Sequence, residues 1–275
     1  MPDKMNVLLA QLRPALRNTS RNLETVRKIL AGSGDVDLVV FPELFLSGYT
    51  TSKPEELAQD LEGSEMDAIA RLATETSTAV ILGAPERAPA GIANSAISVD
   101  RYGNIMGTYR KTHLFGSERD AYVAGNELLI VDLDGVRAGI MICFDVEFPE
   151  VARALVKAGA NLLVTISANM DPFGRDHDVF ATARALENGV PHLYVNQVGR
   201  GEAFTFAGGT MIVSADGDRL AEAGAAKEKV VRHQLDLSAR SVERPEDLRP
   251  DYLQEMRGPL PVVFARRARD RSRMS

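Results

Sequence analysis

The chain has one cysteine, Cys143, among its 275 residues. A single thiol excludes an intrachain disulfide framework, and it excludes a zinc or iron–sulfur site built from several cysteines. A thiol that stays free also favours a reducing compartment.

Long apolar runs are missing as well. No uncharged apolar run reaches the roughly 18 residues that a membrane span needs, and the first residues show no apolar segment of signal-peptide character. The formal net charge of -6 argues against a nucleic acid or an anionic membrane as the main partner. We therefore expect a cytoplasmic protein that binds neither nucleic acid nor a membrane.

No linker and no internal repeat divides the chain, and 45% hydrophobic residues are enough for a sizeable core. We predict one domain over residues 1–264. The remaining segment, 265–275, is rich in arginine. For this segment we expect a solvated tail rather than packing on a partner subunit.

Helical patterns alternate with strand patterns in the outer thirds of the chain, whereas the middle shows hairpins. We predict helices at residues 18–31, 54–59, 64–77, 150–156 and 175–188. We predict strands at residues 6–12, 36–43, 78–83, 93–99, 105–110, 128–133, 136–142, 161–166, 192–198, 209–214 and 230–237. Two mixed sheets packed face to face, with helices outside, accommodate this α/β pattern in one domain.

The cysteine lies where an apolar strand, residues 139–142, runs into a turn and then a helix. A thiol on such a turn is exposed at the end of a rigid element, beside backbone N–H groups that can stabilise an oxyanion. A lone cysteine is, however, more often a small buried hydrophobe. Taken alone, Cys143 favours that structural interpretation.

Three charged residues have little structural reason for their positions. Glu43 ends an apolar strand, Lys111 follows the strand at 105–110, and Glu118 follows a short loop. Singly, each is better explained as a capping or solvated charge.

Three blocks resemble the signature blocks of the nitrilase (carbon–nitrogen hydrolase) superfamily, in the same order. They are residues 41–45 (Phe-Pro-Glu-Leu-Phe), 109–115 (Tyr-Arg-Lys-Thr-His-Leu-Phe) and 141–145 (Met-Ile-Cys-Phe-Asp). Segments at 104–107, 148–150, 183–188 and 208–212 match too, so the resemblance covers residues from about 5 to 240. Three blocks in order are far more specific than one.

The resemblance implies an α-β-β-α sandwich that hydrolyses nonpeptide C–N bonds through a cysteine, without a cofactor. Glu43 matches the general base, Lys111 the family's lysine and Cys143 the nucleophile. Glu118 matches a second glutamate found in many members, although Ala124 replaces the proline expected before Gly125. The family also suggests a homodimer or a larger assembly through the outer helices.

The chemistry of these residue types agrees with those roles. A free thiol has a pKa of about 8.5, so attack at neutral pH needs a base or a neighbouring cation. A partly desolvated carboxylate beside a second one has a pKa raised toward neutrality, which suits a proton shuttle. Lys111 could donate to the tetrahedral oxyanion together with the N–H of Phe144.

A papain-like Cys–His pair and a metal site are the alternatives within this chemistry. The four histidines, His113, His177, His192 and His233, lie in no recognisable protease context. No His-x-x-x-His pair occurs, so we expect no metal. His113 could orient its loop, and His177 could line the entrance to the site.

The sequence around the cysteine favours an amide as substrate. Cys143-Phe144-Asp145 resembles the Cys-Tyr-Asp of many amidase-type members, whereas true nitrilases typically carry Cys-Trp-Glu. Candidate pocket residues are Tyr49, Phe144, Asn169, Phe173 and Phe204, although core packing explains each aromatic equally well. Arg175 could bind a substrate carboxylate but is better explained as an exposed residue at a helix start.

Several functions stay open at this point. A small aliphatic amide, an omega-amide of a dicarboxylate and an N-carbamoyl amine all fit the same catalytic residues. A nitrilase is less favoured. A noncatalytic binding role would not require all four catalytic residues, and an acyltransferase of the lipoprotein-modifying branch would need membrane spans.

Overall fold

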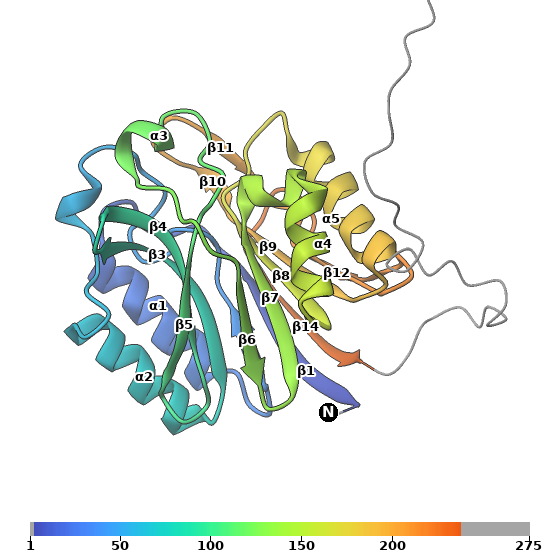
Figure 1. Ribbon diagram of the computed structural model, residues 1–275. Coiled ribbons are helices and arrows are strands. Elements are labelled where there is room, and N and C mark those ends of the chain that lie inside the picture. The colour runs from blue at the N-terminus through green and yellow to red at the C-terminus, as the bar shows by residue number, and fades with distance from the viewer. Residues whose placement is uncertain (1–2, 238–275) are drawn as a thin grey trace, which may run out of the picture. The chain divides into compact units, whose positions relative to one another are not determined.

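Two six-stranded mixed sheets lie face to face in residues 3–237, the part of the chain that the computed structural model describes (Figure 1). The first sheet has the order β14-β1-β2-β3-β4-β5 and the second the order β13-β12-β9-β8-β7-β6. The first consists of β1 (Lys4–Gln11), β2 (Leu38–Val40), β3 (Ala79–Ala88), β4 (Gly91–Val99), β5 (Ile105–Arg110) and β14 (Lys229–Asp236). The second consists of β6 (Leu129–Leu133), β7 (Val136–Ile142), β8 (Leu162–Ser167), β9 (His192–Asn196), β12 (Met211–Val213) and β13 (Arg219–Glu222).

The inner faces of the two sheets form the main core. Leu9 and Ile81 from the first sheet share one buried apolar cluster with Ile140 and Val164 from the second. Strands β2 and β8 are buried along their whole length, as their nearly continuous apolar sequence predicts. Apolar burial of this kind contributes about 25 cal/mol per Å² and holds the sheets together.

Helices cover the outer face of each sheet (Figure 1). They are α1 (Thr19–Ala31) and α2 (Ser64–Thr76) on the first sheet, and α4 (Pro149–Lys157) and α5 (Gly174–Asn188) on the second. Val26 and Ile69 pack with Val39 of β2, and Ala181 packs with Tyr194 of β9. The predicted α-β-β-α sandwich is therefore confirmed.

Turn chemistry explains the hairpin at the start of the second sheet. Asp134 and Gly135 join β6 to β7 and have φ values of 53° and 91°. Two positive φ angles in succession are the conformation that an Asp-Gly hairpin turn provides. The second strand of the hairpin ends at Ile142, directly before Cys143, so its register helps to set the position of the thiol.

Some predicted elements differ from the structure. The strand predicted at 36–43 is only β2: Phe41 and Pro42 still hydrogen-bond to β3, and Glu43 lies in the turn that follows. The helix predicted at 54–59 is a single 3₁₀ turn, η1 (Pro54–Glu56). The strand predicted at 192–198 is split: β9 ends at Asn196, and β10 (Val198–Arg200) pairs with β11 (Thr205–Ala207) in a separate ribbon.

The predicted domain end at residue 264 and the arginine-rich tail at 265–275 lie outside the described residues. Within residues 3–237, no helix is both long enough and apolar enough to cross a membrane.

His192 on β9 makes stability depend on pH. Its side chain is fully buried; Nδ1 lies 2.9 Å from the carbonyl oxygen of Ala181 and Nε2 lies 2.8 Å from Thr165 Oγ1. Burial lowers the pKa of His192 to about 4. Below the ordinary value of about 6.5, the unfolded chain binds a proton that the native chain does not. The free energy of unfolding should therefore fall by up to about 3 kcal/mol between pH 6.5 and 4.

The His192→Gln variant isolates this effect because glutamine keeps a donor and an acceptor but does not titrate. We expect urea denaturation to show a smaller loss of stability for this variant than for the wild type between those pH values. Parallel stability curves for the two proteins would contradict the assignment.

Candidate active site

Cys143 lies on a strained turn at the end of β7. It begins the 3₁₀ helix η2 (Cys143–Glu147) and has φ of 45°, in the left-handed region that non-glycine residues rarely adopt. Such strain persists only where the surroundings hold it, and it is concentrated at functional sites. The turn presents the thiol at the sheet end beside the N–H of the next residue, Phe144.

The carboxylate of Asp145 holds this turn and the loop after β5 together. It accepts hydrogen bonds from the Ile142 N–H at 3.0 Å, the Tyr109 hydroxyl at 2.8 Å and the His113 N–H at 3.0 Å. The Thr112 hydroxyl donates to it as well, at 3.0 Å. Asp145 is fully buried, so these bonds form away from competing water.

His113 belongs to the same cluster. Its Nδ1 lies 2.9 Å from Asp145 Oδ1, and its ring stacks on Phe148 with 3.9 Å between the ring centroids. It thus orients the loop, as the sequence suggested, and does not form a Cys–His pair. Sequence reasoning missed Asp145, although a carboxylate two positions after the nucleophile was visible in the matched block.

Lys111 lies between two buried carboxylates. Its Nζ is 2.8 Å from Glu43 Oε1 and 2.8 Å from Glu118 Oε2, and all three side chains are at most 1% exposed. Lys111 directly follows β5, and Glu118 begins the short helix α3 (Glu118–Ala121). The structure thus brings Glu43, Lys111 and Glu118 together. The alanine at position 124, where the resemblance led us to expect a proline, does not prevent this placement of Glu118.

Further donors satisfy the two carboxylates. The side-chain amide of Asn94 donates to Glu43 at 2.7 Å, and the N–H of Ala168 donates to its other oxygen at 2.7 Å. The hydroxyl of Tyr49 donates to Glu118 at 3.0 Å. Buried charges are tolerated only when paired and hydrogen-bonded in this way.

Gly83 of β3 allows the turn that carries Glu43 to approach closely. A Cβ at residue 83 would lie 2.4 Å from both the Pro42 oxygen and the Leu44 nitrogen. The Gly83 N–H donates to the Pro42 carbonyl at 3.2 Å, and the Leu46 N–H donates to the Gly83 carbonyl at 3.1 Å. A side chain here would displace the backbone on either side of Glu43.

Burial and charge set the protonation of the cluster. Burial raises the pKa of Glu43, and the charge of Lys111 opposes that rise. Burial acts to lower the pKa of Lys111, but Glu43 and Glu118 outweigh it and hold that pKa well above its usual value. Burial and the charge of Glu43 raise the pKa of the Cys143 thiol. The sulfur therefore rests as a thiol, and its attack needs a base.

A cavity of about 150 Å³ opens beside Cys143. Its lining residues are Tyr49, Lys111, Phe115, Cys143, Phe144, Glu147, Ala168, Asn169, Met170, Phe173, Asp176 and His177. Four predicted pocket residues, Tyr49, Phe144, Asn169 and Phe173, are among them, whereas Glu43 and Glu118 are not.

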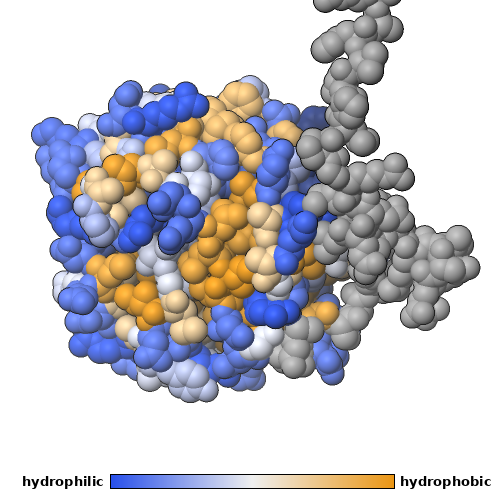
Figure 2. Space-filling model, in the orientation of Figure 1, coloured by the Kyte–Doolittle hydropathy of each residue, from blue (hydrophilic) through white to orange (hydrophobic). Residues whose placement is uncertain are grey.

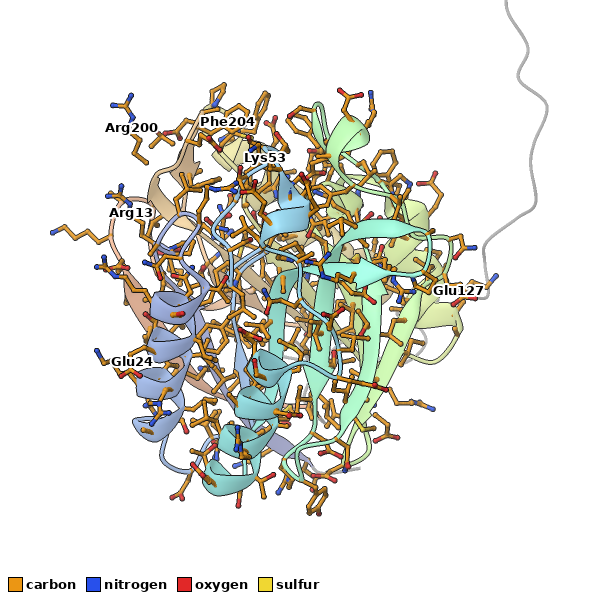
Figure 3. The ribbon with its side chains drawn as sticks, turned by 90° about the vertical axis from the view of Figure 1, so that its left-hand side faces the viewer. Arg13, Glu24, Lys53, Glu127, Arg200 and Phe204 are labelled. Carbon is orange, nitrogen blue, oxygen red and sulfur yellow. The ribbon has the colours of Figure 1, made fainter. Side chains whose placement is uncertain are left out.

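Two other candidates lie elsewhere. Phe204 is at the upper surface in Figure 3 and contacts Tyr49, with 6.4 Å between ring centroids, without lining the cavity. Arg175 lines a separate cavity with Asp171 and Tyr194, so it does not face Cys143.

Sequence reasoning missed several groups of the cavity wall. Phe115 contacts Phe144 edge to face at 5.4 Å, and two acidic residues, Glu147 and Asp176, belong to the lining. His177 lines the cavity, as suggested; its Nδ1 lies 2.8 Å from the Tyr194 hydroxyl and its Nε2 lies 3.3 Å from Glu147 Oε1. Glu147 is four positions after the cysteine, a spacing that could have indicated it.

Within residues 3–237, no group of three or more His, Cys, Asp or Glu side chains could hold a metal ion. The groups at Cys143 can instead supply a nucleophile, a carboxylate base, a fixed cation and backbone N–H donors.

Comparison with known proteins identifies the family. The family model described as carbon-nitrogen hydrolase matches residues 7–242. A protein of Pseudomonas sp. named (R)-stereoselective amidase is 38% identical over 92% of this chain and 92% of its own length.

Solved structures agree. An amidase from Nesterenkonia sp. is 25% identical, with a TM-score of 0.80 over 94% of this chain and 95% of that chain. A structure of a variant of the Nesterenkonia sp. AN1 amidase shows covalent addition of the acetamide moiety of fluoroacetamide at the active-site cysteine; it has a TM-score of 0.79, 25% identity, and covers 92% and 94% of the two chains. The predicted resemblance is confirmed: the chain belongs to the carbon–nitrogen hydrolase family.

Proposed function

We propose that this protein is an amidase that hydrolyses a small nonpeptide amide to a carboxylic acid and ammonia. The observation that carries the proposal is the buried group of Glu43, Lys111 and Glu118 beside a strained, protonated thiol at a cavity. Cys143 would be the nucleophile, Glu43 the general base, and Lys111 with the Phe144 N–H the donors to the oxyanion.

The reaction has two halves. As Cys143 Sγ bonds to the amide carbon, Glu43 takes the thiol proton, and Lys111 and the Phe144 N–H stabilise the negative oxygen. Glu43 then gives the proton to the leaving nitrogen, which departs as ammonia and leaves a thioester. In the second half, Glu43 removes a proton from water as that water attacks the thioester, and the proton returns to the sulfur when the acid leaves.

The raised pKa values support a proton shuttle rather than a preformed thiolate. Burial raises the pKa of both Glu43 and Cys143. A base that is itself made more basic by burial can accept the proton during attack. Glu118, held by Tyr49 and the Phe115 N–H at 2.8 Å, would position Lys111 and the substrate amide.

Release of ammonia from a panel of amides, nitriles and carbamoyl compounds tests this function. We expect turnover of amides and little or none of nitriles. Preferred release from carbamoyl compounds, with carbon dioxide as a second product, would instead indicate a carbamoyl hydrolase. Turnover mainly of nitriles would contradict the proposal, and no turnover of any compound would favour a binding role.

We also propose that the protein acts in the cytoplasm, as a homodimer or larger assembly formed through its outer helices. Val179 and Leu186 of α5 are 52% and 41% exposed, and their spacing of seven places them on one helix face. Apolar side chains also gather over α4, β6 and β7 (Figure 2). Exposed apolar patches commonly mark interfaces between proteins.

Sedimentation analysis tests the assembly. We expect a mass of at least twice the 29.9 kDa of the chain, and a lower mass for the Val179→Asp/Leu186→Asp double variant because a desolvated carboxylate disfavours association. A wild-type protein that stays monomeric at micromolar concentration would contradict this proposal without affecting the proposed activity.

A further inference from the structure

The cavity beside Cys143 carries more negative than positive charge. Glu147 and Asp176 both line it, whereas its lysine, Lys111, is already paired with two carboxylates. No arginine and no second lysine lines the cavity among the described residues. A substrate carboxylate would therefore meet like charges, and it would find no unpaired lysine or arginine among the described lining residues.

The two wall carboxylates also retain unused acceptor capacity. Glu147 has one polar side-chain contact among the described residues, with His177 Nε2 at 3.3 Å. The Asp176 carboxylate receives no hydrogen bond or ion pair from any described residue. Glu43 and Glu118, in contrast, are each bonded to Lys111 and to further donors. Carboxylates with free acceptor positions at a cavity match a positively charged hydrogen-bond donor.

Another part of the wall is aromatic. Phe115 contacts Phe144 at 5.4 Å and Phe173 at 6.5 Å between ring centroids, both edge to face. These rings offer an apolar surface for an aliphatic group, and a nearby cation is also attracted to ring faces. The volume of about 150 Å³ limits the ligand to a small molecule.

We propose that the substrates are amides whose acyl part carries an ammonium group beside a small apolar side chain, such as amides of small amino acids. Glu147 and Asp176 bind the ammonium group, the phenylalanines hold the apolar side chain, and the amide carbon lies at Cys143 Sγ. Water and the amino amide give the amino acid and ammonia. This substrate class rests on the proposed amidase function.

The proposal separates possibilities that share the same catalytic residues. Omega-amides of dicarboxylates and N-carbamoyl amino acids both carry a carboxylate, which Glu147 and Asp176 would repel. Neutral aliphatic amides would fit the aromatic wall but would leave the free acceptor positions of the two carboxylates unused. Only a cationic amide uses both parts of the wall.

Three amides of similar size test the charge preference at pH 7: 2-aminobutyramide (cationic), 2-methylbutyramide (neutral) and succinamate (anionic). We expect kcat/KM for the cationic amide to be at least about tenfold higher than for the neutral amide. We also expect it to be at least about a hundredfold higher than for the anionic amide. Equal or higher values for the neutral or anionic amide would overturn the inference. If none of the three releases ammonia and a wider panel also fails, the proposed amidase function fails instead.

Charge-neutralising variants locate the preference. In both Glu147→Gln and Asp176→Asn, the ratio of kcat/KM for the cationic over the neutral amide should fall about tenfold. Added salt should also lower this ratio in the wild type, because it screens the charges. Asp171→Asn is the matched control: it removes the same charge from the segment before α5 but lines a separate cavity. Its ratio should stay within about twofold of the wild type. An unchanged ratio in both wall variants, or an equal fall in Asp171→Asn, would overturn the inference.

Discussion

Amide turnover should fall at least about 10⁴-fold in the Cys143→Ala variant, because no other group described at the cavity can form the acyl-enzyme. The side chain is small and only 8% exposed, so the free energy of unfolding should change by no more than about 1–2 kcal/mol. Alanine and cysteine face a similar backbone cost at the positive φ of this position, which limits the effect on the turn.

Two measurements make this expectation specific to covalent catalysis. Intact-mass analysis of the rapidly quenched wild type should show a mass increase equal to the acyl group, and the variant should show none. The variant should still bind a good amide substrate with a dissociation constant near that of the wild type. Residual turnover above about one per cent in Cys143→Ala would remove Cys143 from the mechanism.

The Lys111→Met variant should lose both activity and stability. Removing the cation leaves the Glu43 and Glu118 carboxylates buried and facing each other, and breaking a buried ion pair costs about 3–5 kcal/mol. The loss should grow with pH. Unpaired buried carboxylates have raised pKa values in the folded state, so stability is retained at low pH and lost as pH rises through those values.

A triple variant separates stability from chemistry. Glu43→Gln/Lys111→Met/Glu118→Gln removes all three charges, and it should recover most of the stability that Lys111→Met loses while staying inactive. Urea denaturation at pH 5 and pH 8 measures both effects. If Lys111→Met is as stable as the wild type at pH 8, the three side chains do not form a coupled buried group.

The layers of the fold could be predicted from hydrophobic pattern because nearly all strands of the two sheets bury apolar side chains; β13, which buries none, was not predicted. The prediction failed where backbone constraints outweigh pattern. Asn196 ends β9 and the following residues join a separate ribbon, although residues 192–198 read as one strand. A helix as short as α3, with four residues, produces no periodic hydrophobic pattern in the sequence.

The catalytic candidates became visible through matched blocks rather than through periodicity. The residues around Glu43 and Lys111 do not indicate that these two side chains meet. They are 68 positions apart in the sequence, yet their charged groups lie 2.8 Å apart. Asp176 could not be found in this way, because an acid in the first turn of a helix is ordinary, and only its spacing of four from Cys143 could have indicated Glu147. Only the structure shows that the two residues line the same cavity as Cys143.

The rest state of the sulfur bears on how the protein tolerates oxidants and electrophiles. Peroxides and simple alkylating reagents attack thiolates, and burial together with the charge of Glu43 keeps Cys143 protonated. General thiol reagents should therefore modify this protein slowly. A warhead mounted on a substrate-like amide would occupy the cavity, recruit Glu43 as base and label the same sulfur, so selective covalent probes can be built from the substrate scaffold alone.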